Sequence, residues 1–175
     1  FGVNAGMLRY QVGNTNDNHV FFAGATDSTS NELMRITGGG NVGIGTAAPV
    51  SRLHVSSTSF SNTILEGTST AGTWLSLGNT TTGGKWFNMI STGSGNGEGA
   101  GKMLFGRSPV ATGINGYIMT FDSLLHVGIQ TANPHATLQL GNAIENRRIV
   151  LWEDANNNHQ FYGLGINNAM LRYQT

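Results

Sequence analysis

One segment of this chain is repeated 85 positions further along the sequence. The first copy runs Gly-Asn-Val-Gly-Ile-Gly-Thr-Ala-Ala-Pro over residues 40–49 and closes with Leu-His-Val at 53–55. The second runs His-Val-Gly-Ile-Gln-Thr-Ala-Asn-Pro over residues 126–134 and closes with Leu-Gln-Leu at 138–140. Internal repetition at a fixed period is typical of arrays and stacked fibres, in which one unit cannot bury its apolar face without neighbours.

The match extends beyond this segment. The preceding runs, Leu33–Ile36 and Ile118–Phe121, are related by the same offset, and Phe1–Gln11 is repeated as Leu164–Gln174, 163 positions later. The chain is therefore expected to begin and end inside modules. We predict three parts, namely residues 1–55 as the C-terminal part of one β-module, 56–140 as a complete but diverged module, and 141–175 as the N-terminal part of a third.

The composition favours an ordered chain of short strands and turns. Charged residues make up 10% of the sequence, against about 25% in average globular domains, whereas aromatic residues make up 9%. Disordered chains are usually highly charged and poor in aromatic residues, so disorder is not expected. The 26 glycines and the abundant Asn, Ser and Thr favour turns over helices.

Charge and cysteine content exclude several classes of partner. The formal net charge is +0, so the sequence lacks the basic surface that binds nucleic acid or anionic membranes. Zero cysteines exclude disulfides and thiolate-bound zinc. No apolar run approaches the roughly 20 residues that span a bilayer, so membrane insertion is not expected. No cofactor motif is present.

Alternation of apolar and polar residues predicts an all-β fold. Met7–Val12 has the pattern of a half-buried strand, with Leu8, Tyr10 and Val12 on one face. In the middle module we expect about seven short strands, at Ile64–Glu66, Thr73–Leu77, Lys85–Ile90, Lys102–Phe105, Tyr117–Phe121, His126–Thr131 and Thr137–Leu140.

The repeated segments are expected to be structural junctions between modules. Gly43 and Gly45 of the first copy, like Gly128 of the second, lack the Cβ that would keep another backbone away, which suggests packing of one chain on another. Pro49 and Pro134 interrupt strand pairing because proline has no N–H to donate. A bend or a short turn of helix is therefore expected over 49–53 and over 134–138.

The small size of the modules favours association. Domains of about 80 residues bury well under 70% of their unfolded surface, and these modules have no disulfides to compensate. Closed rotational symmetry is the usual arrangement of homo-oligomers, and a fibre must have its axis along its length. We therefore expect a parallel homotrimer.

The run Gly-Asn-Val-Gly-Ile-Gly-Thr-x-x-Pro followed by Leu-x-Val resembles the repeat of bacteriophage tail fibres, tailspikes and related viral attachment proteins. The resemblance covers 40–55 and 126–140, and elements within 156–175 are similar to modules of such fibres and of some large-virus and bacterial surface proteins. It implies an elongated, intertwined β-fibre that is a homotrimer, carries receptor-binding tips and often ends in a self-cleaving chaperone domain, of which this sequence has no segment. Gly40, Asn41 and Gly45 are replaced in the second copy, which leaves open whether the two junctions pack identically.

Two other motifs are better explained by structure than by chemistry. The glycine-rich run 93–101 aligns with a connection between strands at 13–18, and a strand rather than a helix is expected after it, so we predict a hairpin loop and not a phosphate-binding loop. The pair Glu153-Asp154 lies on adjacent positions, whose side chains point to opposite faces of a strand, so a turn is expected there rather than a glycosidase pair.

None of the five histidines has a partner at metal-ligand spacing. In a trimer, one histidine near the axis would become three, and His54 or His126 could then hold a metal or an anion. The simpler hypothesis is that each histidine is hydrogen-bonded or solvated, and no metal site is predicted.

Aromatic residues of the middle module depart from the pattern shared with the other module. Trp74, Lys85, Trp86 and Asn88 are therefore our candidate carbohydrate-binding residues, because aromatic faces stack on sugar rings while amides bind hydroxyls. The alternative is that these aromatic side chains belong to the core.

Together these observations predict a structural shaft of a viral, phage-type tail or attachment fibre, which projects a receptor-binding tip towards the host. Such a protein would be extracellular, on the virion, and its partners would be its own copies, other fibre or virion proteins and a host-surface glycan. It is not expected to be an enzyme. A bacterial surface adhesin built from the same modules is the alternative, followed by a polysaccharide depolymerase.

Overall fold

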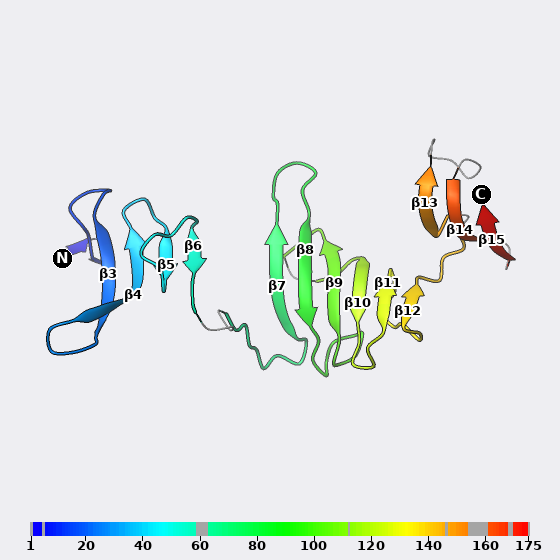
Figure 1. Ribbon diagram of the computed structural model, residues 1–175, viewed down its shortest axis with the longest axis horizontal. Helices are drawn as coiled ribbons and strands as arrows, with labels where there is room; N and C mark the ends of the chain where they lie inside the picture. Colours follow the sequence, from blue (N-terminus) through cyan, green and yellow to red (C-terminus); the bar gives the residue numbers. More distant parts are fainter. Residues whose placement is uncertain are drawn as a thin grey trace. The chain divides into compact units, whose positions relative to one another are not determined.

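The computed structural model describes residues 2–4, 6–58, 63–111, 113–145, 147–153, 161–167 and 170–174. All regular structure in these ranges is β, in mostly antiparallel sheets, which confirms the predicted fold class (Figure 1). In the same ranges, no helix is long and apolar enough to cross a membrane. The chain forms two compact units, Phe1–Leu65 and Glu66–Thr175.

The first unit contains a small hairpin and a four-stranded sheet. The hairpin pairs β1 with β2, and the sheet has the order β3-β4-β5-β6. Pairing is antiparallel except between β5 and β6, which are parallel. The strands are β1 (Gly2–Asn4), β2 (Met7–Arg9), β3 (Asn18–Gly24), β4 (Ser30–Thr37), β5 (Val42–Ile44) and β6 (Leu53–Val55).

The second unit contains a six-stranded sheet and a three-stranded sheet. The larger sheet has the order β12-β11-β10-β9-β8-β7, with β11 and β12 parallel, and the smaller has the order β13-β14-β15. The strands are β7 (Thr73–Gly78), β8 (Trp86–Ser91), β9 (Met103–Ser108), β10 (Tyr117–Phe121), β11 (Val127–Ile129), β12 (Leu138–Leu140), β13 (Ile149–Glu153), β14 (Phe161–Asn167) and β15 (Met170–Gln174).

Both repeated segments form the same compact parallel crossover. Residues 45–52 connect β5 to β6, and residues 130–137 connect β11 to β12. Parallel strands usually need a connection of a dozen residues or more, so these crossovers are short. The residue after each first strand has a left-handed conformation, with φ of 68° at Gly45 and 58° at Gln130, which turns the chain back at once. Bends rather than helical turns follow Pro49 and Pro134.

The backbone hydrogen bonds of the two crossovers correspond one to one at the offset of 85. In the first, Gly45 N donates to Leu33 O at 3.0 Å and Ser56 N to Ile44 O at 2.9 Å. The matching bonds in the second are Gln130 N to Ile118 O at 3.1 Å and Gly141 N to Ile129 O at 2.7 Å. The turn before each crossover also matches, because Asn41 N donates to Thr37 Oγ1 and His126 N to Asp122 Oδ1. The backbone geometry is thus kept although half of the residues differ.

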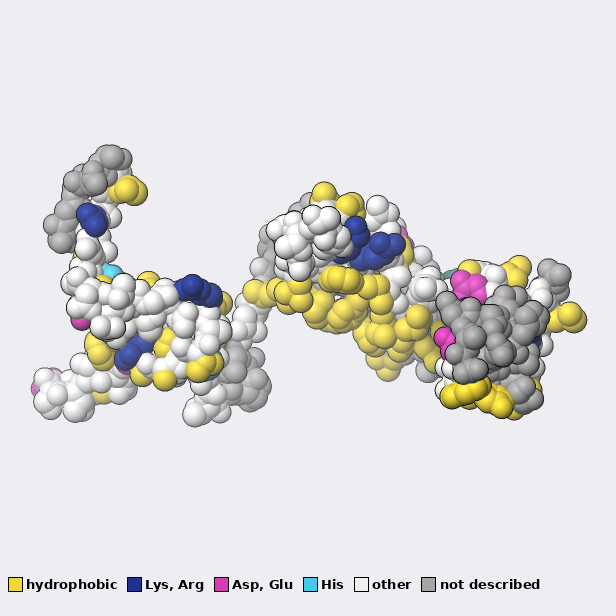
Figure 2. All heavy atoms as spheres, turned by 90° about the horizontal axis from the view of Figure 1, so that it is seen from above, with side chains coloured by type: hydrophobic (Ala, Val, Ile, Leu, Met, Phe, Trp, Pro, Cys, Tyr) yellow, Lys and Arg dark blue, Asp and Glu magenta, His cyan; other side chains and the backbone are white. Residues whose placement is uncertain are grey.

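One face of the six-stranded sheet is covered by the unit's own loops. Beneath the connections 92–102 and 109–116, Ile90 is 2% exposed and Leu104 is 1% exposed, and Thr120 is buried beside them. The opposite face is apolar and open. Figure 2 shows hydrophobic side chains gathered along one side of this sheet, with polar side chains on the other. Burial within one chain is therefore confined to one face.

Six of the seven strands predicted in the middle module are present, but the one at Ile64–Glu66 is wrong. That segment is irregular and exposed, and among the described residues β7 pairs only with β8 and forms the edge of its sheet. The half-buried strand expected at Met7–Val12 is also wrong in extent and burial. It stops at Arg9, because β1 offers only three pairing positions, and Leu8 is 67% exposed because nothing in its unit packs on it.

The sheets end where the predicted modules end. The four-stranded sheet ends at Val55 and the six-stranded sheet at Leu140. The division into compact units differs, since it falls after Leu65 and keeps residues 141–175 with the preceding sheet. The module boundaries at 55 and 140 therefore stay a prediction.

Candidate functional site

The four candidate sugar-binding residues lie at one end of the six-stranded sheet. Trp74 is on β7, Trp86 and Asn88 are on β8, and Lys85 immediately precedes β8. Trp74 pairs with Ile90, and residues 86, 88 and 90 alternate along one strand, so both tryptophans and Asn88 share the loop-covered face. Two of the four residues have clear structural roles on that face.

Asn88 is a core residue. Its side chain is 1% exposed, and its Nδ2 donates to the carbonyl of Gly113 at 2.7 Å, which ties the 109–116 loop to β8. Trp86 lies over Gly78, where an added Cβ would come 2.3 Å from the indole ring. Asn88 is thus closed to a ligand in this arrangement, whereas both tryptophans are half-buried.

Trp74 and Lys85 line two different small hollows. Trp74 lies beside Asn96, Glu98 and Tyr117 around a space of about 120 Å³. Lys85 lies with Arg107, Ser108, Pro109 and Asn115 around another of about 190 Å³. The structure does not bring the four candidates together around one cavity, and carbohydrate binding here stays a prediction.

Glu98 is the centre of a polar cluster that the sequence did not predict. Its carboxylate accepts hydrogen bonds from the Tyr117 hydroxyl and from Asn133 Nδ2. Lys102 Nζ donates to the carbonyl oxygens of Glu98 and Ala132 and to Asn133 Oδ1. Burial, followed by the hydrogen bond and the negative charge of Glu98, raises the pKa of Tyr117 to about 12. A lone carboxylate within a run of glycines was the available signal.

This cluster shows what the glycine-rich run does. Residues 92–102 form the loop between β8 and β9, as predicted, and the loop folds back so that Gly95 N donates to Thr70 O at 2.8 Å. Asn96 Nδ2 donates to Ala71 O at 2.8 Å. The loop is therefore a cover for the sheet, held at one end by the residues before β7 and at the other by Glu98.

Of the described histidines, His126 has an acidic partner, whereas His54 does not fit the hypothesis that each histidine is hydrogen-bonded or solvated. His126 Nδ1 is 3.0 Å from Asp122 Oδ2. Burial opposes the charged form of Asp122, but hydrogen bonds from the His126 and Leu124 N–H groups and from the His126 ring outweigh it and lower the pKa of this carboxyl. His54 Nδ1 is buried without a partner. No three His, Asp or Glu residues of the described part lie together as a metal site would require, and His159 lies outside that part.

Acidic residues elsewhere form ion pairs within the chain. The pairs are Glu32 with Arg35 at 2.6 Å, Glu145 with Arg148 at 3.0 Å and Glu153 with Arg147 at 2.6 Å. Asp154, the second member of the acidic pair considered above, lies outside the described residues. These contacts give the three carboxylates structural roles.

The junction glycines permit the close approach that was predicted, and the neighbour is the chain's own crossover. A Cβ on Gly43 would lie 2.5 Å from Thr46 O and 3.4 Å from Pro49 Cβ. The same atom on Gly128 would lie 2.7 Å from Thr131 O and 3.5 Å from Pro134 Cβ. Each of these glycines therefore leaves room for the threonine and proline of the loop that follows it, and packing against a second chain stays a prediction.

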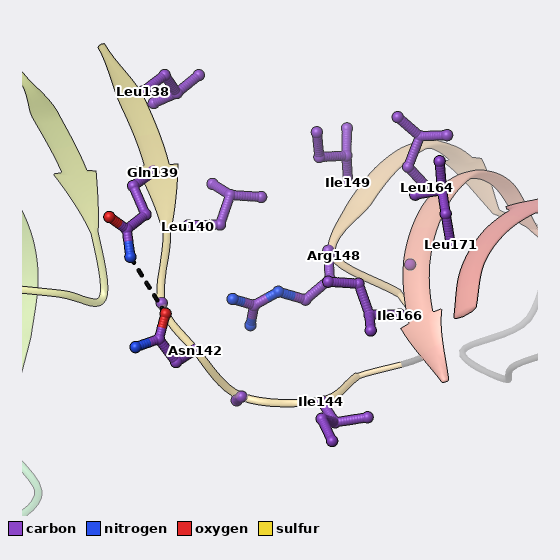
Figure 3. Close-up of a pocket in the computed structure, with 13 residues that line it drawn as sticks. Leu138, Gln139, Leu140, Asn142, Ile144, Arg148, Ile149, Leu164, Ile166 and Leu171 are labelled. Atoms are coloured by element: carbon purple, nitrogen blue, oxygen red, sulfur yellow. Dashed lines mark hydrogen bonds between the residues drawn. The ribbon is translucent and has the colours of Figure 1, made fainter. Parts of the chain in front are cut away.

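A hollow of about 520 Å³ lies between β12 and the three-stranded sheet of the second unit (Figure 3). Its walls are mostly aliphatic, and the Arg148 side chain, 7% exposed, extends along one side. The aliphatic residues are Leu138, Leu140, Ile144, Ile149, Leu164, Ile166 and Leu171. The sequence did not predict this hollow, because its walls come from strands whose pairing was not known.

Comparison with models of known protein families gives no match, and no curated protein matches this sequence. Functional inference therefore rests on the residues themselves. The geometry described above offers apolar surfaces, self-contained junctions and internally paired charges.

Proposed function

We propose that this chain is a shaft segment of a viral, phage-type tail or attachment fibre. In this proposal the repeated β-modules associate as a parallel homotrimer and project a receptor-binding tip towards the host surface. The shaft is structural, lies on the virion outside the cell, and contacts other fibre or virion proteins at its ends.

The observation that carries the proposal is the correspondence of the two crossovers. Each sheet ends in the same parallel pair, held by the same backbone hydrogen bonds, although Gly45 is replaced by Gln130 and Ser56 by Gly141. A shaft is a series of units in which each unit connects to the next in one way. Such a series would keep the geometry of its junctions while the residues that form them change.

A host glycan is the surface partner that the sequence favours. Trp74, Trp86 and Lys85 remain the candidate contacts, because their side chains are not fully buried, whereas Asn88 supports the loop next to them. In the shaft proposal any such contact is secondary to the receptor-binding tip.

The test is the mass of the purified chain in solution. Light scattering should give a particle of about three times 18.5 kDa, because the modules are too small to bury their apolar faces alone. A folded, stable monomer would contradict the trimeric shaft. Antibody labelling then distinguishes origins, since label on virions supports the fibre and label confined to a bacterial surface would support the adhesin instead.

A further inference from the structure

The open face of the six-stranded sheet is made of rows of aligned apolar side chains. Strand register places six residues in one continuous row across the sheet, and none of them is charged. The row is Leu75, Met89, Phe105, Met119, Ile129 and Leu140. A second row beside it is Thr73, Ser91, Met103, Phe121, Val127 and Leu138.

The four-stranded sheet of the first unit carries the same rows. Register there aligns Phe21, Met34, Ile44 and Val55, and next to them His19, Ile36, Val42 and Leu53. Met34 and Met119, Ile44 and Ile129, and Val42 and Val127 are related by the offset of 85. The open face therefore recurs with its residue types at matching positions.

Every residue of these rows is half-buried or exposed, although the Tyr10 ring lies 5.8 Å from His19 at one end of the first unit's rows. One face alone is too small for a stable interface. Six strands at about 4.8 Å spacing and two rows of side chains give roughly 400 Å², whereas stable interfaces bury about 800 Å² per partner. Several faces in series would reach that area. The recurrence of the rows in two sheets supplies such a series on one chain.

We infer that these faces dock onto the same faces of two further copies of this chain, related by rotation, so that residues of the same number meet in layers. Only the number of copies rests on the fibre proposed above; the docking of face on face rests on the rows. Met119 would meet Met119 in one layer, and Met34 would meet Met34 in another.

The distribution of polar residues in the second row favours this register over a reversed one. Thr73 and Ser91 lie at the β7 end of the row, and Val127 and Leu138 lie at the β12 end. Rotation about a common axis places the Thr73 and Ser91 hydroxyls of one copy next to the same hydroxyls of another copy, where they can hydrogen-bond. Reversal would bury Thr73 against Leu138 and leave its hydroxyl without a partner, which costs free energy.

The hollow beside β12 continues the same face. Leu138 and Leu140, which end the two rows, are also two of its wall residues (Figure 3). Its lining is aliphatic, and the nearby Arg148 guanidinium already has Glu145 as its partner. Side chains of a neighbouring copy therefore fit this hollow better than a charged small ligand.

Single cysteines test the layers, because the chain has no cysteine of its own. Met119→Cys lies on the open face, and its control Ser94→Cys is exposed on the 92–102 loop, which covers the other face. A short bis-maleimide adds to two thiols and so links two chains. In a threefold arrangement about two thirds of Met119→Cys chains should become linked dimers, with one chain in three left single, and Ser94→Cys should stay unlinked.

Each other outcome has a separate meaning. A trimer by light scattering in which Met119→Cys links no better than Ser94→Cys would overturn the docking face and leave the fibre proposal standing. Complete conversion to dimers would overturn the threefold arrangement. Linking of Leu75→Cys chains to Leu140→Cys chains in a mixture would overturn the parallel register. If Met119→Cys does not fold, Met34→Cys makes the same comparison in the first unit, with Ser28→Cys, on the exposed turn between β3 and β4, as its control.

Discussion

At each crossover one glycine faces one larger residue, and the second copy reverses the order. Gly45 has φ of 68°, and a Cβ there would lie 2.2 Å from Ser56 O. Gln130 takes the same left-handed conformation with a full side chain, and its neighbour is Gly141, where a Cβ would lie 3.1 Å from Gln130 Cβ. At both crossovers a side chain on one residue would thus crowd the backbone of the other, and a glycine at that other position leaves its backbone freer to move aside.

A double-mutant cycle tests this exchange. Gly45→Gln should lower the free energy of unfolding by about 1–3 kcal/mol, because it overpacks the turn and forces a left-handed conformation on a residue with a side chain. Adding Ser56→Gly should recover part of the loss, as in the natural pair Gln130 and Gly141. Denaturant unfolding measures both. Gly97→Gln, where nothing lies within 4 Å, is the control, and strictly additive effects would show that the two positions are independent.

Residue-level prediction from sequence was partly successful for physical reasons. The close approach at Gly43 and Gly45 was predicted, because a glycine inside an alternating strand usually marks a place where another group comes near the backbone. The neighbour that uses the space was not predicted, since it depends on a parallel pairing over an unusually short connection. Asn88 was assigned to a ligand because an amide beside tryptophans suits a sugar, and only burial shows that it binds Gly113 instead.

Among the elements, the loop 92–102 is held at one end by ionisable side chains. Tyr117 on β10 donates a hydrogen bond from its hydroxyl to Glu98 in the loop, and Lys102 at the end of the loop binds two carbonyls. The strands themselves could be predicted from the alternation of apolar and polar residues and from the turn residues between them. The loop that covers them could not be predicted, because a run of glycines carries no periodicity to indicate where it folds.

The Tyr117 contact predicts a loss of stability in alkali. The pKa of Tyr117 is raised to about 12 in the folded protein, whereas an unfolded tyrosine titrates near 10. The contribution of Tyr117 to the free energy of unfolding is therefore complete below about pH 10 and is lost as pH rises towards 12. The difference in free energy of unfolding between the parent and Tyr117→Phe should shrink over that range. Tyrosinate absorbance provides a direct check, since the ionisation near pH 12 should disappear in Tyr117→Phe. A constant difference across the range would refute the assignment.

At the scale of the whole molecule, electrostatics would contribute little to the proposed association of copies. The formal net charge is +0, only 10% of residues are charged, and four described carboxylates pair with cationic or histidine side chains of their own chain. The open faces are apolar instead. Association by such faces depends on removing apolar surface from water and not on attraction between charges.

Association should therefore resist salt. Raising sodium chloride from about 0.1 M to about 1 M shortens the Debye length from about 10 Å to about 3 Å and weakens exposed ion pairs, but it leaves apolar contacts in place. We expect the mass in solution to stay that of the trimer, and sodium sulfate to raise the melting temperature. Dissociation on adding sodium chloride would indicate an interface held by charges.

The matched crossovers also bear on how such a gene can change. If DNA encoding the two copies were misaligned during recombination, the chain could pass from Ile44 directly to Gln130, with 85 residues deleted. β5 would then enter the second crossover, which already carries its own compensating Gly141, and β12 would take the place of β6. The reverse event would duplicate the intervening segment. The length of the chain could thus change with the number of copies of this segment, independently of the sequences that lie between the crossovers.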